Sequence, residues 1–193
     1  MATTRFVKAE RLQKLPPYLF AEIDKKKKAA LAAGRDVINL GVGDPDRPTP
    51  PTIIKSLQAH AENPAFHQYA LDQGAPELRQ TIASFCKARY GLDLDPNSEI
   101  LPLIGSKEGI AHFPLAALNP GDISLVPDPC YPVYRSSSLF AGADVYTMPL
   151  EPRLGFRPDL DAIPADVLAR ARLLFLNYPN NPTAGTADLA FFQ

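Results

Sequence analysis

The chain has 193 residues, of which 46 % are hydrophobic, and its formal net charge is −1. These values suit a soluble globular protein with a core of its own, and they give no reason to expect nucleic acid or an acidic membrane as a partner. There is no apolar run long enough to span a membrane and no signal peptide, and two cysteines, Cys86 and Cys130, make no disulfide framework, so we expect a cytoplasmic protein.

The first part of the chain is predicted to be helical, with one short strand. A helix is expected from Pro16 to about Ala33, followed by a strand at Val37–Leu40. That strand leads into Gly41-Val-Gly-Asp-Pro-Asp46. Because Asp46 stands where a dinucleotide fingerprint needs its third glycine, we favour backbone brought close to another group over a Rossmann site.

Two more helices are predicted before the middle of the chain. One covers residues 50–60 with Thr49 as its cap, and the other covers residues 76–91. Their apolar side chains recur at helical spacing, which predicts that they face a core. These side chains are Ile53, Ile54 and Leu57 in the first helix, and Leu78, Ile82, Phe85 and Cys86 in the second. The loop between the helices carries a prominent tyrosine, Tyr69.

The stretch Leu101-Pro-Leu-Ile-Gly-Ser-Lys-Glu-Gly-Ile110 has the pattern of a strand, a turn and a helix start. Ile100–Ile104 is predicted to be a buried strand that breaks at Gly105, and Ser106 is the expected helix cap. Unpaired N–H groups at such a helix start attract phosphate, and Lys107 adds a positive charge. Taken alone, the stretch is more often an ordinary capped turn.

After this helix, strands and helices alternate. Strands are predicted at Ile123–Val126, Asp144–Met148 and Arg172–Asn177, with helices between them up to Gly142 and over residues 159–169. Thr186 is the expected cap of a last helix, in which the chain stops at Gln193, so we expect a truncated chain. The alternation predicts an α/β domain with a mostly parallel sheet.

Three unusual loops follow predicted strands, at the edge where such sheets bind ligands. They offer a phosphate seat at Ser106, an aromatic ring at Tyr131 and an amide at Asn181, which Pro182 fixes. A flat phosphorylated heteroaromatic ring with a phenolic oxygen would use all three, and pyridoxal phosphate has this shape. Alone, Tyr131 is more often a packed aromatic residue and Asn181 a turn residue.

Six motifs in the same order carry a resemblance to a known family. They are Asn39-Leu-Gly-Val-Gly-Asp-Pro-Asp46, Tyr69 with Gly74-Ala-Pro-Glu-Leu-Arg79, Gly105-Ser-Lys-Glu-Gly109, Asn119-Pro-Gly-Asp122, Asp128-Pro-Cys-Tyr-Pro-Val-Tyr134 and Tyr178-Pro-Asn-Asn-Pro-Thr183. The chain resembles the N-terminal half of pyridoxal-phosphate-dependent aminotransferases of the aspartate aminotransferase superfamily. It is most similar to LL-diaminopimelate aminotransferases, which act in lysine biosynthesis.

The resemblance implies a fold and a division into domains. It implies a three-layer α/β/α large domain, of which residues 46–193 are the first part. Residues 1–45 would form an N-terminal arm and a segment of the small domain. The implied activity moves an amino group between an amino acid and a 2-oxo acid, in a homodimer that binds neither nucleic acid nor membrane.

The resemblance also implies roles for individual residues. Ser106 and Lys107 would hold the cofactor phosphate, and Tyr131 would stack on the pyridine ring. Asn181 would donate a hydrogen bond to the phenolic oxygen and lie near the substrate carboxylate. Gly43 would meet that carboxylate with its backbone N–H, and Tyr69 would reach the phosphate of the neighbouring subunit.

Several expected parts of such an enzyme are missing from the chain. The Schiff-base lysine, the aspartate on the pyridine nitrogen and the carboxylate-binding arginine would all come after Gln193, so no catalytic base is assigned and the chain alone is expected to be inactive. No metal site is expected. One departure is Ala184, where many relatives have glycine, which loosens the tie to aspartate-type enzymes.

Two alternatives remain from the sequence. The chain could be a non-catalytic α/β module that binds a phosphate ligand or a partner subunit, which the missing lysine favours. A weaker alternative is a nucleotide-binding α/β domain. Among aminotransferases, alanine, aspartate or glutamate enzymes stay open besides the diaminopimelate class.

Overall fold

The computed structural model describes residues 7–41, 43, 45–70 and 73–193. The chain forms two compact units, which we describe separately. Residues 17–102 form the helical unit, and residues 103–193 together with the N-terminal segment up to Pro16 form the sheet unit. Val42 and Asp44 of the glycine-rich motif and Leu71 and Asp72 of the tyrosine loop lie outside the described residues.

The sheet unit is built on three parallel strands. They are β1 (Ile123–Asp128), β2 (Asp144–Pro149) and β3 (Ala171–Leu174), in the order β2-β1-β3. Ile123 pairs with Asp144 of β2 and with Ala171 of β3, and the register to β3 shifts after that first pair. β1 is therefore the central strand, and its two neighbours are reached through helical crossovers, as parallel pairing requires.

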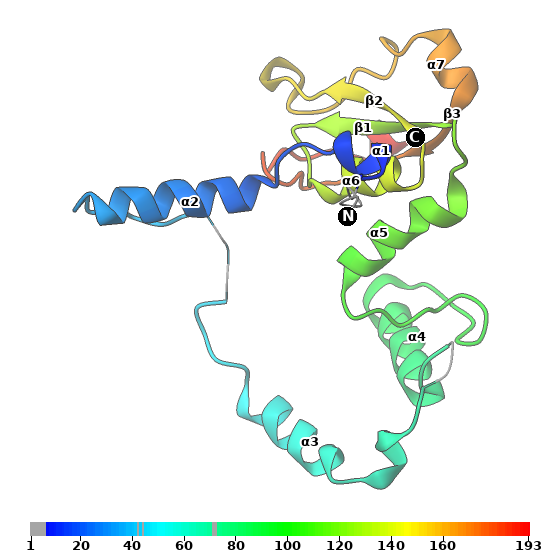
Figure 1. The fold of residues 1–193 in the computed structure, drawn as a ribbon. Helices are drawn as coiled ribbons and strands as arrows, with labels where there is room; N and C mark the ends of the chain where they lie inside the picture. The colour runs from blue at the N-terminus through cyan, green and yellow to red at the C-terminus, as the bar shows by residue number, and fades with distance from the viewer. Residues whose placement is uncertain (1–6, 42, 44, 71–72) are drawn as a thin grey trace, which may run out of the picture. The chain divides into compact units, whose positions relative to one another are not determined.

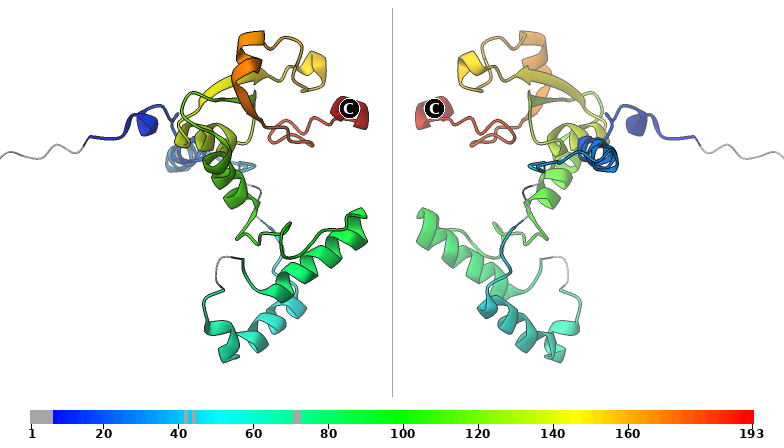
Figure 2. Two further views of the ribbon diagram at one scale, coloured as in Figure 1. Left: turned by 90° about the vertical axis from the view of Figure 1, so that its right-hand side faces the viewer. Right: turned by 90° about the vertical axis from the view of Figure 1, so that its left-hand side faces the viewer.

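Helices cover both faces of this sheet. In Figures 1 and 2, the sheet lies between α7 (Ala165–Arg170) on one side and α5 (Ser106–Ala117) and α6 (Val133–Phe140) on the other. The short helices α1 (Glu10–Gln13), η2 (Pro152–Leu154) and α8 (Leu189–Phe192) complete the unit. The predicted α/β architecture with a parallel sheet is confirmed.

Alternating side chains of β1 build the two faces of the core, because successive strand residues point to opposite sides. Ile123 and Leu125 pack with Met148 of β2 and with Ile163, which precedes α7. Ser124 points the other way, where the Ser138 hydroxyl of α6 donates to its Oγ at 2.9 Å in a buried contact. The small, hydrogen-bonded serine pair lets α6 lie against the strand without an unpaired polar group.

Two predicted strands are absent from the structure. Val37–Leu40 and Ile100–Ile104 have no strand geometry, and Leu101 and Ile104 are 66 % and 97 % exposed. A strand exists only when a neighbouring strand accepts its hydrogen bonds, and within the described residues neither segment has such a neighbour. Pro102 also removes one donor from the second segment. The predictions of a strand at Val37–Leu40 and of a buried strand at Ile100–Ile104 were wrong. The last predicted strand is confirmed up to Leu174.

The helical unit contains α2 (Leu19–Ala32), α3 (Pro51–Ala61) and α4 (Pro76–Tyr90), with a short η1 turn (Pro64–His67). All three predicted helices are confirmed with small shifts at their ends. Gly91 follows α4 in the left-handed conformation, at φ +72°. None of the helices in the described part of the chain is long and apolar enough to cross a membrane.

Three helix caps were predicted one or more residues away from the true ones. Pro50 precedes α3 and Gly105 precedes α5, and neither helix has a side-chain cap. Thr49 is displaced because Pro51 already supplies the first helical turn. At α8 the cap is Asp188, whose Oδ1 accepts the Phe191 N–H at 3.0 Å, and not Thr186.

The apolar faces predicted for α3 and α4 are not covered. Ile53, Leu57, Leu78 and Phe85 are between 48 % and 71 % exposed, and Ile54 is 42 % exposed. Periodicity identifies which face of a helix is apolar, but that face is buried only when a second layer packs on it. Within residues 17–102 as described, no such layer exists, so the predicted core position is wrong for these side chains, while Ile82 and Cys86 are half-buried.

A single cation organises the loops beside α4. Arg79 is 6 % exposed and is the only buried residue among those described between 17 and 102. Its Nη1 donates to the carbonyl oxygens of Gln73 at 2.9 Å and Gly74 at 2.7 Å, and its Nε donates to Pro96 O at 2.8 Å. The guanidinium thus joins the end of the Tyr69 loop to the turn after α4.

Replacing Arg79 should destabilise the helical unit. In Arg79→Met the three carbonyls lose a charged donor, and we expect the free energy of unfolding to fall by about 3 kcal/mol, since hydrogen bonds to charged groups contribute more than neutral ones. Urea unfolding followed by circular dichroism measures this. Arg89→Met, at an exposed arginine of the same helix, is the control and should change stability by less than about 0.5 kcal/mol. Equal effects of the two substitutions would contradict this role of Arg79.

Candidate functional site

The loops that follow β1 and β3 meet at the carboxyl edge of the sheet. They start from neighbouring parallel strands, so both leave the sheet at the same edge. The Asn180 Nδ2 donates to the carbonyl oxygen of Pro129 at 3.4 Å, which links the second loop to the first. The structure therefore brings together the two loops that carry Tyr131 and Asn181.

Asn180 is the residue that shapes the second loop. It is 3 % exposed, and its Nδ2 also donates to Thr183 Oγ1 at 2.9 Å. Its N–H donates to Gly185 O at 2.8 Å, and its own carbonyl accepts the Ala184 N–H at 2.7 Å. Sequence analysis missed this asparagine. The signal was present in the Asn-Asn-Pro turn, where either asparagine can hydrogen-bond the backbone.

Asn181 differs from its neighbour in being exposed. Its N–H donates to Asn177 Oδ1 at 3.2 Å, which holds the backbone. Within the described residues its side-chain amide makes no hydrogen bond. The Asn180 side chain thus stabilises the loop, whereas the Asn181 side chain presents both a hydrogen-bond donor and an acceptor to solvent.

Tyr131 is half-buried in the first loop and contacts another aromatic ring. Its ring centroid lies 5.8 Å from that of Tyr134, with an angle of 78° between the planes. Tyr134 is buried and lies in the first turn of α6, where its N–H donates to Tyr131 O at 3.2 Å. Burial raises the pKa of the Tyr134 hydroxyl, so this hydroxyl is neutral at physiological pH.

The neighbouring cysteine is not a reactive group. Burial, and then the charge of Asp128, raise the pKa of the Cys130 thiol to about 11. The thiol therefore stays protonated near neutral pH, which removes the nucleophilic form. Its Sγ lies 3.4 Å from Tyr131 O, in a contact that supports the loop.

The start of α5 leaves backbone donors open. Gly105 has φ +156° and ψ +156°, a conformation that residues with a side chain rarely adopt. Among the described residues, nothing accepts the N–H groups of Ser106 and Lys107, and both side chains are exposed. The Glu108 side chain turns back instead, and its Oε2 accepts the Ile104 N–H at 2.8 Å.

α5 precedes β1 in the chain and packs against α6 and β3. α5 leads into β1 through a short turn and runs in the opposite direction to it (Figure 1). Its first turn lies at the end of α5 that is away from the strands (Figure 1). Within the described part of the chain, no hydrogen bond joins Ser106 or Lys107 to the Tyr131 and Asn181 loops.

Two predicted site residues belong to the helical unit. Tyr69 is 98 % exposed. Gly43 is exposed as well, and a Cβ added there would meet no atom within 4 Å. The roles of both residues stay predictions.

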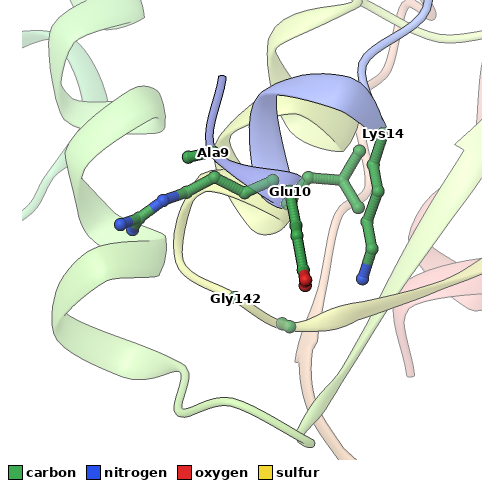
Figure 3. A pocket seen from close by; sticks show the side chains of 7 residues that line it. Ala9, Glu10, Lys14 and Gly142 are labelled. Carbon is green, nitrogen blue, oxygen red and sulfur yellow. The ribbon is translucent and has the colours of Figure 1, made fainter. Parts of the chain in front are cut away.

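Surface hollows of the sheet unit do not mark the predicted site. One hollow, of about 370 Å³, is lined by Glu10, Lys14 and Gly142 among others, and none of the predicted site residues lines it. Figure 3 shows the lining residues beside α1. Another hollow, of about 520 Å³, is lined by residues 155–157 and 183–186 with Asp188. No cluster of three metal-ligating side chains occurs in the described residues.

Two residues other than glycine have a left-handed backbone, one of them in the Asn181 loop. Phe156 and Ala184 both have φ +59°. The Tyr178 hydroxyl donates to Phe156 O at 3.0 Å, and a Cβ on Gly185 would lie only 2.8 Å from the Phe156 Cβ. Burial raises the pKa of Tyr178, so its hydroxyl remains a donor. Position 185 therefore has no room for a side chain, and Ala184 beside it has a backbone conformation that is unfavourable for alanine.

Comparison with known families gives a match over most of the chain. The sequence profile of the family described as Aminotransferase class I and II matches residues 35–193. The chain is 58 % identical over 188 residues to an LL-diaminopimelate aminotransferase of Syntrophobacter fumaroxidans, an alignment that covers 97 % of this chain and 48 % of that protein. It is 54 % identical over 185 residues to an LL-diaminopimelate aminotransferase of Aquifex aeolicus, covering 96 % and 48 %.

Solved structures agree in fold. Substrate-bound BacF from Bacillus subtilis superposes with a TM-score of 0.87 at 41 % identity, covering 97 % of this chain and 48 % of that one. A probable N-succinyldiaminopimelate aminotransferase from Thermus thermophilus superposes with a TM-score of 0.81 at 36 % identity, covering 91 % and 47 %. The chain spans about half the length of the curated relatives that it matches.

The two asparagines should separate structure from ligand binding. We expect Asn180→Ala to lower the free energy of unfolding by about 1–3 kcal/mol, since Pro129 O and Thr183 Oγ1 lose the donor of a buried side chain. Asn181→Ala should leave stability unchanged, because its exposed amide has no partner in the described structure. Thermal unfolding measures both, and equal losses in the two variants would contradict this division of roles.

Ala184 offers a test in the opposite direction. Its left-handed backbone costs an alanine about 1–2 kcal/mol, whereas a glycine has no such strain and loses only the larger entropy of its unfolded chain. We therefore expect Ala184→Gly to stabilise the protein by up to about 1 kcal/mol in urea unfolding. Ala162→Gly, at a residue without a positive φ, should destabilise it or leave it unchanged. A loss of stability in Ala184→Gly would show that the turn is not strained.

Proposed function

Since the chain belongs to the class I and II aminotransferase family, we propose that the intact protein is an aminotransferase that moves an amino group between an amino acid and a 2-oxo acid. The observation that supports the proposal most directly is the hydrogen bond between Asn180 and Pro129 O. It joins the Tyr131 loop to the Asn181 loop at the carboxyl edge of the sheet, which is where ligands of such sheets bind.

The residues at this edge fit pyridoxal 5′-phosphate, the cofactor of this family. The open N–H groups of Ser106 and Lys107 suit a phosphate, and the Lys107 charge adds to them. The half-buried ring of Tyr131 suits a flat aromatic partner. The exposed amide of Asn181 suits a phenolic oxygen. The one acidic side chain in the first turn of α5, Glu108, directs its carboxylate to the Ile104 N–H.

When bound, the cofactor supplies an electron sink for bond cleavage at the α-carbon of the amino acid. The protein positions it. Tyr131 keeps water from one face of the ring, and the Asn181 amide fixes the ring's rotation by donating to its oxygen. We assign the Gly43 N–H to the substrate carboxylate, where the absence of a side chain leaves room for a ligand.

We further propose a homodimer in which Tyr69 reaches the phosphate bound by the neighbouring subunit. In support, the Tyr69 ring is 98 % exposed, so its own chain does not use it for packing. We retain residues 1–45 as the arm and small-domain segment and residues 46–193 as the first part of the large domain. A cytoplasmic location stays a prediction from the sequence.

We place the lysine that binds the cofactor covalently beyond Gln193, since none of the lysines in this chain matches the motif for it. The aspartate for the pyridine nitrogen and the arginine for the substrate carboxylate are placed there too. The chain alone should then be able to hold the cofactor only non-covalently and should not turn over.

For the substrate we propose LL-diaminopimelate, in lysine biosynthesis. The support is the name shared by curated relatives that are between 50 % and 58 % identical to the chain. Aspartate aminotransferase of Thermotoga maritima is less similar, at 29 % identity. Alanine, aspartate and glutamate remain the amino donors to compare.

The decisive experiment uses the intact protein. We expect it to bind pyridoxal phosphate with a visible absorbance band and to transfer the amino group of LL-diaminopimelate to 2-oxoglutarate faster than that of alanine or aspartate. Asn181→Ala should shift the band, because the amide contacts the ring oxygen. Residues 1–193 alone are the control and should show no turnover. An intact protein that neither binds the cofactor nor transaminates would favour the non-catalytic module instead.

A further inference from the structure

Three aromatic rings form a row from the core to the site, which we call the aromatic row: Phe175, Tyr134 and Tyr131. The rings of Tyr134 and Phe175 are stacked, with centroids 4.6 Å apart and 15° between their planes. The ring of Tyr131 meets Tyr134 edge to face, at 5.8 Å and 78°. Stacked and edge-to-face pairs are the two arrangements that aromatic quadrupoles favour.

The inner two rings are held firmly by the fold. Tyr134 is 6 % exposed and lies in the first turn of α6, directly after the loop that carries Tyr131. Phe175 follows β3 directly, and its N–H donates to Leu125 O of β1 at 3.0 Å. The two rings thus come from different elements, and each is fixed by backbone that belongs to the parallel sheet or to the helix packed on it.

The outer ring depends on this support. Tyr131 is half-buried, and within the described residues its hydroxyl makes no hydrogen bond. Its edge-to-face contact with Tyr134 is its only aromatic contact among the described residues. The half-buried ring keeps part of its surface exposed.

We propose that Tyr134 and Phe175 are positioning residues, which hold the Tyr131 ring in the plane that a flat cofactor ring needs. This inference rests on the proposed function, because it takes Tyr131 as the stacking residue. A ring that is already fixed before the ligand binds loses less side-chain entropy on binding. The residues that fix it therefore raise the affinity for the ligand. Neither Tyr134 nor Phe175 needs to touch the cofactor.

The test measures the dissociation constant of pyridoxal phosphate from the intact protein by absorbance or fluorescence titration. We expect Tyr134→Leu and Phe175→Leu each to weaken binding about three- to tenfold, as the loss of an aromatic pair would. Tyr134→Phe retains the ring and should restore the wild-type affinity. Phe140→Leu, at a 42 % exposed aromatic residue of the same helix, is the matched control and should not change it.

A double-mutant cycle separates positioning from general damage to the fold. If Tyr134 acts through Tyr131, then Tyr134→Leu should have no further effect on cofactor affinity in a Tyr131→Ala background. The inference would be overturned, with the proposed function intact, if Tyr134→Leu weakened cofactor binding equally in both backgrounds. It would also be overturned if the wild-type protein bound the cofactor and Tyr134→Leu did not weaken that binding. If wild-type protein does not bind the cofactor, the proposed function fails, and this inference fails with it.

Discussion

The parallel pairing of β1 with β3 is the constraint on which the site depends. Loops that leave neighbouring parallel strands emerge at one edge, and the hydrogen bond from Asn180 to Pro129 O closes the gap between them. Residues 129–131 and 177–185 are far apart in the sequence, so no local preference could bring them together. The backbone hydrogen bonds of the sheet bring the two loops to one edge, and the Asn180 side chain then links them.

The edge is built from pairs in which one residue supports and the other is presented. Asn180 is buried and satisfied, while Asn181 is exposed. Tyr134 is buried against Phe175, while Tyr131 is half-buried beyond it. A ligand gains affinity when its partners are already fixed, because less conformational entropy is lost on binding. The supporting residue is therefore as much part of the site as the one that would touch the ligand.

The helical unit lacks an apolar core in its described residues, because no second layer packs on the apolar faces of its helices. Its one buried side chain in the described residues is the cation Arg79, held by three carbonyl oxygens, while the apolar faces of α3 and α4 are exposed. Apolar faces of this size are normally covered in a folded protein. Tyr69 and Gly43, which we propose contact the phosphate and the substrate carboxylate, both lie in this unit, so their geometry depends on what covers it in the intact protein.

The sequence by itself determined the local elements. Periodicity, glycine and proline located α2 to α7 and the strands β1, β2 and β3 to within a few residues, apart from the late start of α7, and six short motifs identified the family. It failed where the answer depends on a neighbour. Ile100–Ile104 has the composition of a strand, yet it is not one without a partner, and the apolar stripes of α3 and α4 are not buried without a second layer. Only the tertiary structure showed that Asn180 supports Asn181, and that Phe175 supports Tyr134. Composition and spacing encode what one segment prefers, whereas hydrogen bonds and ring contacts between segments exist only after the chain has folded.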